Sequence, residues 1–128
     1  GTMVGSGDLG NYHVEIKGAS LTTDYEGNPT VVITYAWTNN SDDTTTSLSS
    51  VHARAFQDGV QLENAIVMNE DAFDSSSYMK EVRPGTTIDV QNAFVLTSET
   101  STIEVEIEEL ISFSDEKVRM DFGPTALS

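Results

Sequence analysis

A polar run at residues 39 to 47 contains the side chains that could most readily carry chemistry. Within it, Asp43, Thr45 and Ser47 have the D-x-T-x-S spacing of metal-dependent adhesion sites, but those sites stand above a parallel α/β sheet. An EF-hand needs a glycine at its sixth position and a glutamate at its twelfth, and neither follows Asp42 or Asp43. Asn, Asp, Ser and Thr side chains bond their own backbone in turns, so the run is interpreted as a loop between strands.

Catalytic motifs are missing from the sequence. It has no G-x-S-x-G elbow, no H-E-x-x-H pair, no glycine loop for phosphate and no cysteine. The two histidines, His13 and His52, project from predicted outer faces of strands. The neighbouring carboxylates Glu108 and Glu109 point to opposite faces of a strand, so they cannot work as an acid–base pair. We therefore expect neither an enzyme nor a cofactor.

The chain is strongly acidic, with 21 Asp and Glu residues against six Lys and Arg residues and a formal charge of −15. This field repels the phosphates of nucleic acids, so we expect no nucleic-acid partner. Oxygen ligands for calcium are available at Asp42, Asp43, Glu70, Asp71 and Asp74, but no loop motif brings them together. A solvated acidic surface is the favoured interpretation, and no metal site is assigned.

A row of glutamates at positions 104, 106 and 108 shares one face of a predicted strand. Successive members lie about 6.8 Å apart, at roughly 3.4 Å per residue. Such a row suits a cationic partner, and it equally prevents an edge strand from pairing with another chain. The edge-protecting interpretation is favoured.

The elements that position these residues alternate apolar and polar side chains with a period of two, and helical periodicity is scarce. Seven strands are predicted, at residues 12–17, 31–37, 51–57, 60–66, 88–96, 103–108 and 117–122. They predict an all-β domain, an immunoglobulin-like β-sandwich of about seven antiparallel strands, with a closed barrel as the alternative.

The ends of the chain are expected to lie outside this sandwich, which is assigned to residues 12–123. Residues 1–11 are rich in glycine and are interpreted as a flexible leader or a cloning remnant, and residues 124–128 as a C-terminal tail. No apolar run approaches the roughly 20 residues of a membrane span, and no signal-peptide core is present.

In two of these strands the alternation predicts which side chains share the buried, apolar face. The alternation in residues 31–37 predicts that Trp37 is buried on the same face as Val31, Ile33 and Tyr35. In residues 88–96, Asn92 is the one polar residue on an otherwise apolar face.

Asp58 and Gly59 predict a two-residue type I′ turn in a long hairpin over residues 51–66. In this register Gln57 pairs with Val60, and replacing Gln57 by threonine is expected to be nearly neutral. Further pairs are Ala55 with Leu62, Arg54 with Glu63, Ala53 with Asn64, His52 with Ala65 and Val51 with Ile66.

Two stretches carry a resemblance to a known family. They are "YAWTNNSDDTTT", with Trp37, Asn39, Asn40 and Ser41, and "ARAFQDGVQLENA", with Ala55, Phe56, Gln57, Asp58, Gly59, Val60 and Leu62. Over about residues 12–122, the chain resembles immunoglobulin-like domains of unknown function in surface lipoproteins of Gram-positive bacteria. These are similar in fold to secreted immunoprotective antigens of mycobacterial type. The resemblance implies an exported, lipid-tethered domain outside the cell and supplies no catalytic residues.

Two functions follow as expectations. The first is a noncatalytic extracytoplasmic binding or interaction module, monomeric, whose partner is a protein or a cell-surface ligand. The second is a small-ligand carrier that binds calcium or a glycan through acidic and aromatic loops. The candidate interaction surface comprises Asn39, Asn40, Asp42, Asp43, Phe56, Phe73 and Tyr78.

Overall fold

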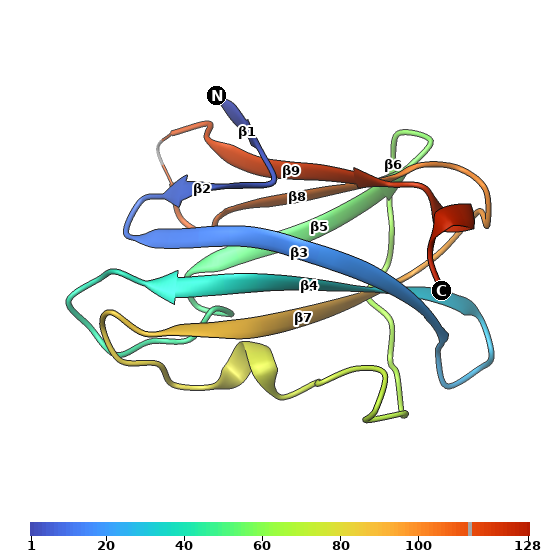
Figure 1. Ribbon diagram of the computed structural model, residues 1–128, viewed down its shortest axis with the longest axis horizontal. Coiled ribbons are helices and arrows are strands. Elements are labelled where there is room, and N and C mark those ends of the chain that lie inside the picture. Colours follow the sequence, from blue (N-terminus) through green and yellow to red (C-terminus); the bar gives the residue numbers. More distant parts are fainter. Residues whose placement is uncertain (113) are drawn as a thin grey trace.

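The alternating side chains build two sheets that pack face to face (Figure 1). The computed structural model describes residues 1–112 and 114–128. The described residues form nine strands: β1 (Thr2–Val4), β2 (Ser6–Leu9), β3 (Tyr12–Thr23), β4 (Pro29–Asn39), β5 (Val51–Gln57), β6 (Val60–Gln61), β7 (Thr87–Val95), β8 (Ile103–Glu109) and β9 (Lys117–Phe122). They also form two short 3₁₀ helices, η1 (Ser77–Met79) and η2 (Pro124–Ala126).

The first sheet has the order β1-β9-β8-β5-β6 and the second the order β2-β3-β4-β7. All pairs are antiparallel except β1 with β9. The all-β sandwich predicted from the alternation is therefore confirmed. The two sheets are separate, so the closed barrel is not the architecture.

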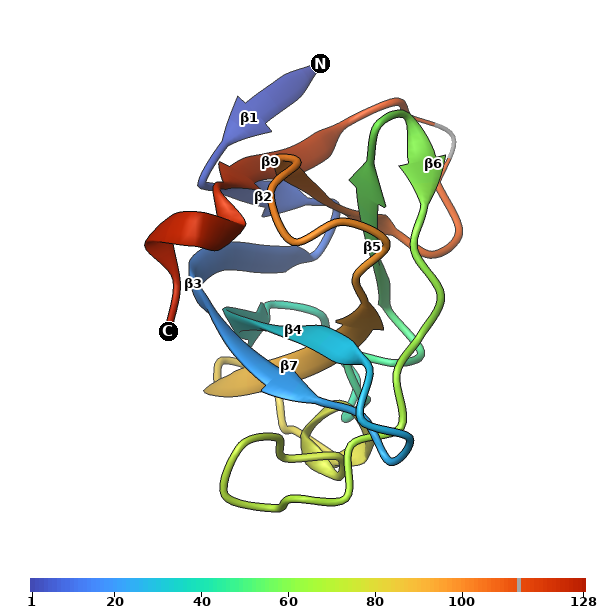
Figure 2. The same cartoon turned by 90° about the vertical axis from the view of Figure 1, so that its right-hand side faces the viewer.

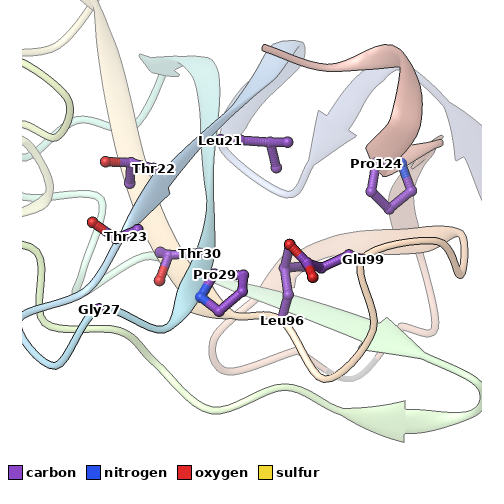
Figure 3. A pocket seen from close by; sticks show the side chains of 9 residues that line it. All are labelled: Leu21, Thr22, Thr23, Gly27, Pro29, Thr30, Leu96, Glu99 and Pro124. Carbon is purple, nitrogen blue, oxygen red and sulfur yellow. The ribbon is translucent and has the colours of Figure 1, made fainter.

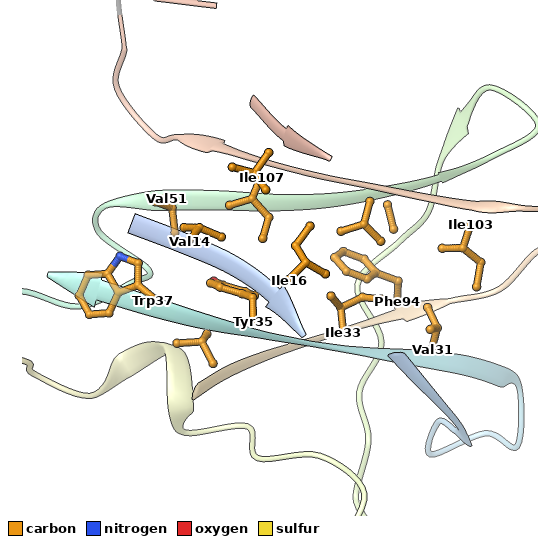
Figure 4. Packing of buried hydrophobic residues seen from close by; sticks show 14 of the residues in the cluster. Val14, Ile16, Val31, Ile33, Tyr35, Trp37, Val51, Phe94, Ile103 and Ile107 are labelled. Atoms are coloured by element: carbon orange, nitrogen blue, oxygen red, sulfur yellow. The ribbon is translucent and has the colours of Figure 1, made fainter. Parts of the chain in front are cut away.

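The core lies between the inner faces of the sheets (Figure 4). Val31, Ile33, Tyr35 and Trp37 of β4 are each at most 2% exposed, which confirms the predicted face. The indole of Trp37 stacks on the Tyr12 ring with the centroids 5.8 Å apart. The register of β3 shifts between Ile16 and Gly18, which marks a β-bulge or local irregularity in this strand.

A second, smaller apolar cluster covers the outer face of the four-stranded sheet. Val32 and Ala93 of this face pack against Val67 and Phe73, and all four are buried. The segment that carries Val67 and Phe73 passes beneath β4 and β7 in Figure 2. Both faces of β4 are consequently buried along part of its length.

The expectation that residues 1–11 lie outside the fold is wrong. β1 pairs with β9, β2 pairs with β3, and Leu9 is 1% exposed in the core. Gly5 (φ +82°) and Gly10 (φ +60°) permit the turns that end β1 and β2, so these glycines mark tight turns between strands. At the other end, Leu127 packs against the core and the Leu21 N–H donates to the Ser128 carbonyl at 3.0 Å.

The hairpin prediction holds at the turn and fails beyond it. Gln57 pairs with Val60, and both Asp58 (φ +53°) and Gly59 (φ +80°) have the positive φ values of a type I′ turn. β6 ends at Gln61, and one further bond joins the Leu62 N–H to the Ala55 carbonyl at 2.8 Å.

After Leu62 the chain crosses to the other sheet. Asn64 forms a bridge with Phe94, and the Ala65 N–H donates to the Ala93 carbonyl at 2.9 Å. The predicted pairs of residues 51–54 with residues 63–66 are therefore wrong. The crossing satisfies edge groups of β7 and buries Val67, which a longer hairpin would not do.

Replacing Gly59 by valine should destabilise the domain by about 1 kcal/mol or more, because a β-branched residue is strained at positive φ. Gly59→Asn is the matched control, since asparagine tolerates this conformation and no atom lies within 4 Å of the position of a new Cβ. Urea unfolding of both variants measures the effect. Equal stability of the two variants would contradict the assigned turn.

Candidate functional site

The polar loop after β4 is organised around Asn39, which is completely buried. Its Nδ2 donates to the carbonyls of Asp43 (2.8 Å) and Val82 (2.9 Å), and its Oδ1 accepts from the Ser41 N–H (3.0 Å). Asp42 and Asp43 are exposed. The loop is thus held by its own backbone and side chains. Within residues 1–112 and 114–128, no group of three His, Asp or Glu side chains is placed to hold a metal ion.

The residues of the predicted interaction surface do not form one site. Asn39 and Phe73 are buried, and Tyr78 is half-buried between the two apolar clusters. Asn40, Asp42 and Asp43 are exposed on the loop after β4. Phe56 is half-buried on β5, in the other sheet, with the Arg54 guanidinium 5.5 Å from its ring centroid.

The glutamate row does not protect a sheet edge, because β8 lies between β9 and β5. These neighbours bring cations beside it. Glu106, at the centre of the row, is within 3.1 Å of Arg54, 3.6 Å of Lys117 and 3.7 Å of Arg119. Glu108 pairs with Arg54 at 2.9 Å and Glu104 with Arg119 at 3.4 Å. Half of the chain's six Lys and Arg residues neutralise this row, which leaves it poorly suited to a cationic partner.

A mainly apolar pocket of about 340 Å³ lies where β3 ends and β4 begins. Figure 3 shows Leu21, Pro29, Leu96 and Pro124 around it, with Glu99 as its one charged lining residue. Thr22, Thr23, Gly27 and Thr30 complete the lining. Among the described residues that line this pocket, no buried side-chain polar atom is left without a hydrogen-bond partner. The pocket could therefore select a ligand by shape but not by a specific hydrogen bond.

Two adjoining hollows, here called the side cleft, lie between β5 and β7 and have volumes of about 150 and 210 Å³. Both are lined by Leu48, Asn64, Tyr78 and Asn92. The first also contacts Tyr35, Ser47, Val51, His52 and Ala53, and the second contacts Ala65, Phe73 and Ala93. The cleft opens here because β6 is short and the chain has already crossed to β7.

Asn92 is the distinctive residue of the side cleft. It lies on the inner face of β7, opposite Ile33, as the alternation predicts. Its Oδ1 is buried and has no hydrogen-bond partner among the described residues. A buried amide oxygen without a partner costs about 1 to 3 kcal/mol, so a group that donates a hydrogen bond to it would be favoured.

The other polar groups of the side cleft are suited to binding and not to catalysis. Burial raises the pKa of the Tyr35 phenol well above its usual range, so the phenol stays neutral. The Ser47 hydroxyl donates to the Tyr78 carbonyl at 3.4 Å, and no hydrogen bond joins it to His52 among the described residues. No nucleophile and base are therefore paired in the cleft.

The model of a family described as a domain of unknown function, DUF5067, matches residues 3–109. The chain belongs to this family. A search of curated proteins finds no match to the chain.

Two solved structures share the fold of this DUF5067 domain. One is described as a candidate lipoprotein from Staphylococcus aureus, with a TM-score of 0.67 and 11% identity over 91% of this chain and 86% of that one. The other is a protein from Enterococcus faecalis, with a TM-score of 0.63 and 17% identity over 93% of this chain and 89% of that one. At these identities the similarity shows the fold alone.

The sequence points to some residues of the side cleft and misses others in the DUF5067 domain. Asn92 is visible as a polar residue on an apolar face, and Tyr78 was expected at an interaction surface. Asn64 and Ala53 line the cleft only because the predicted hairpin is interrupted, which no local pattern indicates.

No helix in the described part of the chain is long and apolar enough to cross a membrane.

Proposed function

We propose that this DUF5067 domain is a noncatalytic binding module that works outside the cell as part of a surface lipoprotein. The observation that carries the proposal is the side cleft, where the Asn92 Oδ1 is buried without a partner among neutral polar groups. Such a lining recognises an uncharged ligand by hydrogen bonds and offers no paired acid and base for chemistry.

The strand order supports an immunoglobulin-like arrangement. β3, β4 and β7 occupy the places of strands A, B and E in that fold, and β5, β8 and β9 the places of C, F and G. The proposed kinship to secreted immunoprotective antigens is a similarity of fold. In folds of this kind a rigid sandwich presents its loops and strand edges to ligands, which agrees with a binding role.

The cellular place of the module is proposed from the resemblance to lipoproteins and from the fold shared with the staphylococcal protein. Metabolic labelling of the natural full-length protein with an alkyne-tagged fatty acid tests the lipid anchor. We expect labelled protein that added protease removes from intact cells. Unlabelled protein that survives protease until the cells are lysed would contradict the proposal.

A ligand-observed NMR screen tests the binding role itself. The probes are N-acetylated amino acid amides and neutral monosaccharides, each recorded with the domain and with two variants. We expect saturation transfer to at least one probe, loss of it in Asn92→Leu, and its retention in Asn11→Leu, which changes an exposed asparagine in the β2–β3 turn. Transfer that is unaffected by Asn92→Leu, or conversion of a probe to a product, would contradict the proposed role.

The alternative, a carrier of calcium or a glycan, has weaker support. A glycan platform needs exposed aromatic rings, and the aromatic residues of the loops include Tyr25, Phe73 and Tyr78. Phe73 is 6% exposed and Tyr78 is half-buried, so among these three only Tyr25 presents a face to solvent, at 60% exposure. The acidic residues Asp42 and Asp43 are exposed and adjacent, without converging ligands.

Calcium should therefore stabilise the domain weakly and without selectivity. Divalent cations relieve the self-repulsion of a chain with charge −15, so magnesium should match calcium and sodium chloride should erase both effects. A specific site would instead contribute about 2.7 kcal/mol at a hundredfold excess over Kd. Thermal unfolding with each salt measures the response, with Asp42→Asn combined with Asp43→Asn as the variant. A calcium-selective rise in Tm that this variant abolishes would overturn the expectation.

A further inference from the structure

The geometry points to an extended segment of a basic protein or peptide as the ligand of the side cleft, paired with the free edge of β5. This inference rests on the proposed binding function and names the class of its ligand. Three features carry it: an unpaired strand edge, a neutral cleft beside that edge, and the acidic charge of the whole domain.

The free edge follows from the register of β5. The Leu110 N–H donates to the Ser50 carbonyl on the β8 side, and the Leu62 N–H donates to the Ala55 carbonyl on the β6 side. Backbone groups alternate between the two sides of an antiparallel strand, so those of Ala53 point toward the β6 side. β6 ends at Gln61, and the Ala53 N–H and carbonyl have no partner there among the described residues.

The opposite wall of the cleft is already occupied by the domain's own chain. The Val95 N–H donates to the Glu63 carbonyl and the Gln91 N–H to the Ser77 hydroxyl, both at 2.9 Å. These contacts cover the β7 edge between Gln91 and Val95 in the way a short added strand would. No segment of the described chain covers the β5 edge at Ala53 in this way, so this edge of the cleft is available for strand addition.

The cleft beside Ala53 selects the kind of segment that pairs there. Ala53 and Asn92 line the same hollow, so a strand bonded to Ala53 could place an N–H or hydroxyl donor near the Asn92 Oδ1. Leu48, Phe73 and Tyr78 supply the apolar wall of the adjoining hollow. Because the lining contains no Asp, Glu, Lys or Arg side chain, a charged residue at the centre of the segment would lose hydration without compensation.

The acidic charge of the domain indicates that the residues on either side of the segment's centre are basic. The domain carries −15, and Glu63, next to the lining residue Asn64, is exposed. Such a field attracts lysine and arginine residues that stay in solvent at either side of the cleft and accelerates association at low salt. The ligand is therefore an extended segment with an uncharged centre and basic flanks.

Selection of phage-displayed random heptapeptides on the domain provides the probe, and the most enriched heptapeptide is synthesised with blocked ends. We expect enriched sequences with lysine or arginine flanking an uncharged, β-branched or aromatic centre. Titration into ¹⁵N-labelled domain should shift the Ala53 amide and the Asn92 side-chain amide and slow hydrogen exchange at Ala53. Asn92→Leu should weaken binding about tenfold, as expected for one lost hydrogen bond in a buried site, and Asn11→Leu should not.

Four outcomes would overturn the inference. Three of them are no enrichment over uncoated plates, shifts centred on another surface such as Phe56 or the β3 edge at Leu21, and a heptapeptide whose affinity is unchanged in Asn92→Leu. Ala53 protection that grows with domain concentration without heptapeptide would also overturn it, because a second copy would then cover the edge. Small neutral probes that bind while heptapeptides fail would leave the binding module intact and exclude only the peptide.

Discussion

Trp37→Ala should lower the free energy of unfolding by about 3 to 5 kcal/mol, the largest effect we expect from a single substitution. Trp37 is completely buried in β4 and stacks on Tyr12, so alanine would leave a large cavity between the sheets. Urea unfolding, followed by far-UV circular dichroism, measures the loss. Tryptophan fluorescence of the wild type should show a blue-shifted maximum, since this is the chain's one tryptophan.

Trp37→Phe serves as the matched control. The Trp37 Nε1 is buried without a hydrogen-bond partner among the described residues, and phenylalanine removes this donor while retaining an aromatic ring. Its cost should be clearly smaller than that of alanine. Equal costs for the two variants, or solvent-like fluorescence in the folded domain, would contradict the assigned packing.

Gln57→Leu should cost about 3 kcal/mol or more. Gln57→Thr should also be clearly destabilising, which corrects the nearly neutral effect expected from the hairpin pattern alone. Gln57 is 1% exposed, and its amide joins the hairpin to the turn between β7 and β8. Nε2 donates to the carbonyls of Ser98 and Ser101, each at 2.9 Å. Oε1 accepts from the N–H groups of Thr97 (3.0 Å) and Ser98 (3.1 Å) and from the Thr97 hydroxyl (3.3 Å). Leucine has a similar volume but leaves these backbone groups unpaired.

Gln61→Leu, in the adjacent strand, separates this effect from any general response of the hairpin. Gln61 is exposed, and no side-chain hydrogen bond is formed by it within the described structure, so its replacement should change stability by less than about 0.5 kcal/mol. Chemical unfolding and amide hydrogen exchange in residues 97–101 report on both variants. A Gln57 variant as stable as the Gln61 variant would refute the role of the amide.

The sequence predicts those parts of the fold that depend on local alternation and turn chemistry. The buried face of β4 follows from a period of two, and the turn at Asp58 and Gly59 follows from their tolerance of positive φ. The same reasoning cannot show where pairing stops. Only the competing edge of β7 decides that the chain leaves β5 after Leu62.

The wrong predictions for Gln57, Glu106 and Leu9 share one physical origin. The burial and the partners of each of these residues depend on segments that are distant in the chain. Gln57 lies in a hairpin that looks half-solvated, yet it is buried by a turn some 40 residues later. The Glu106 row resembles an exposed edge until β5 and β9 supply cations from both sides. Composition likewise suggested a leader at residues 1–11, although Leu9 belongs to the core.

The candidate site was predicted in the same uneven way. Asn92 could be singled out because a polar side chain on an apolar face needs an explanation, and the structure leaves its oxygen without a partner. The sequence places Asn39 at an interaction surface, but its side-chain amide forms hydrogen bonds to Asp43, Val82 and Ser41 that hold the loop together. The presence of a polar residue in the sequence does not show whether its side chain stabilises a turn or is free to bind a ligand.

The pairing of β1 with β9 has a consequence for how the domain forms. Thr2 pairs with Lys117, so β1 has no sheet partner until β9 has left the ribosome. Closing so long a loop has a high entropic cost, and ladders between distant segments slow folding. β2 can form its hairpin with β3 early, but β1 can join its sheet only in a late step. The nascent domain therefore carries an unpaired β1 until β9 has been synthesised.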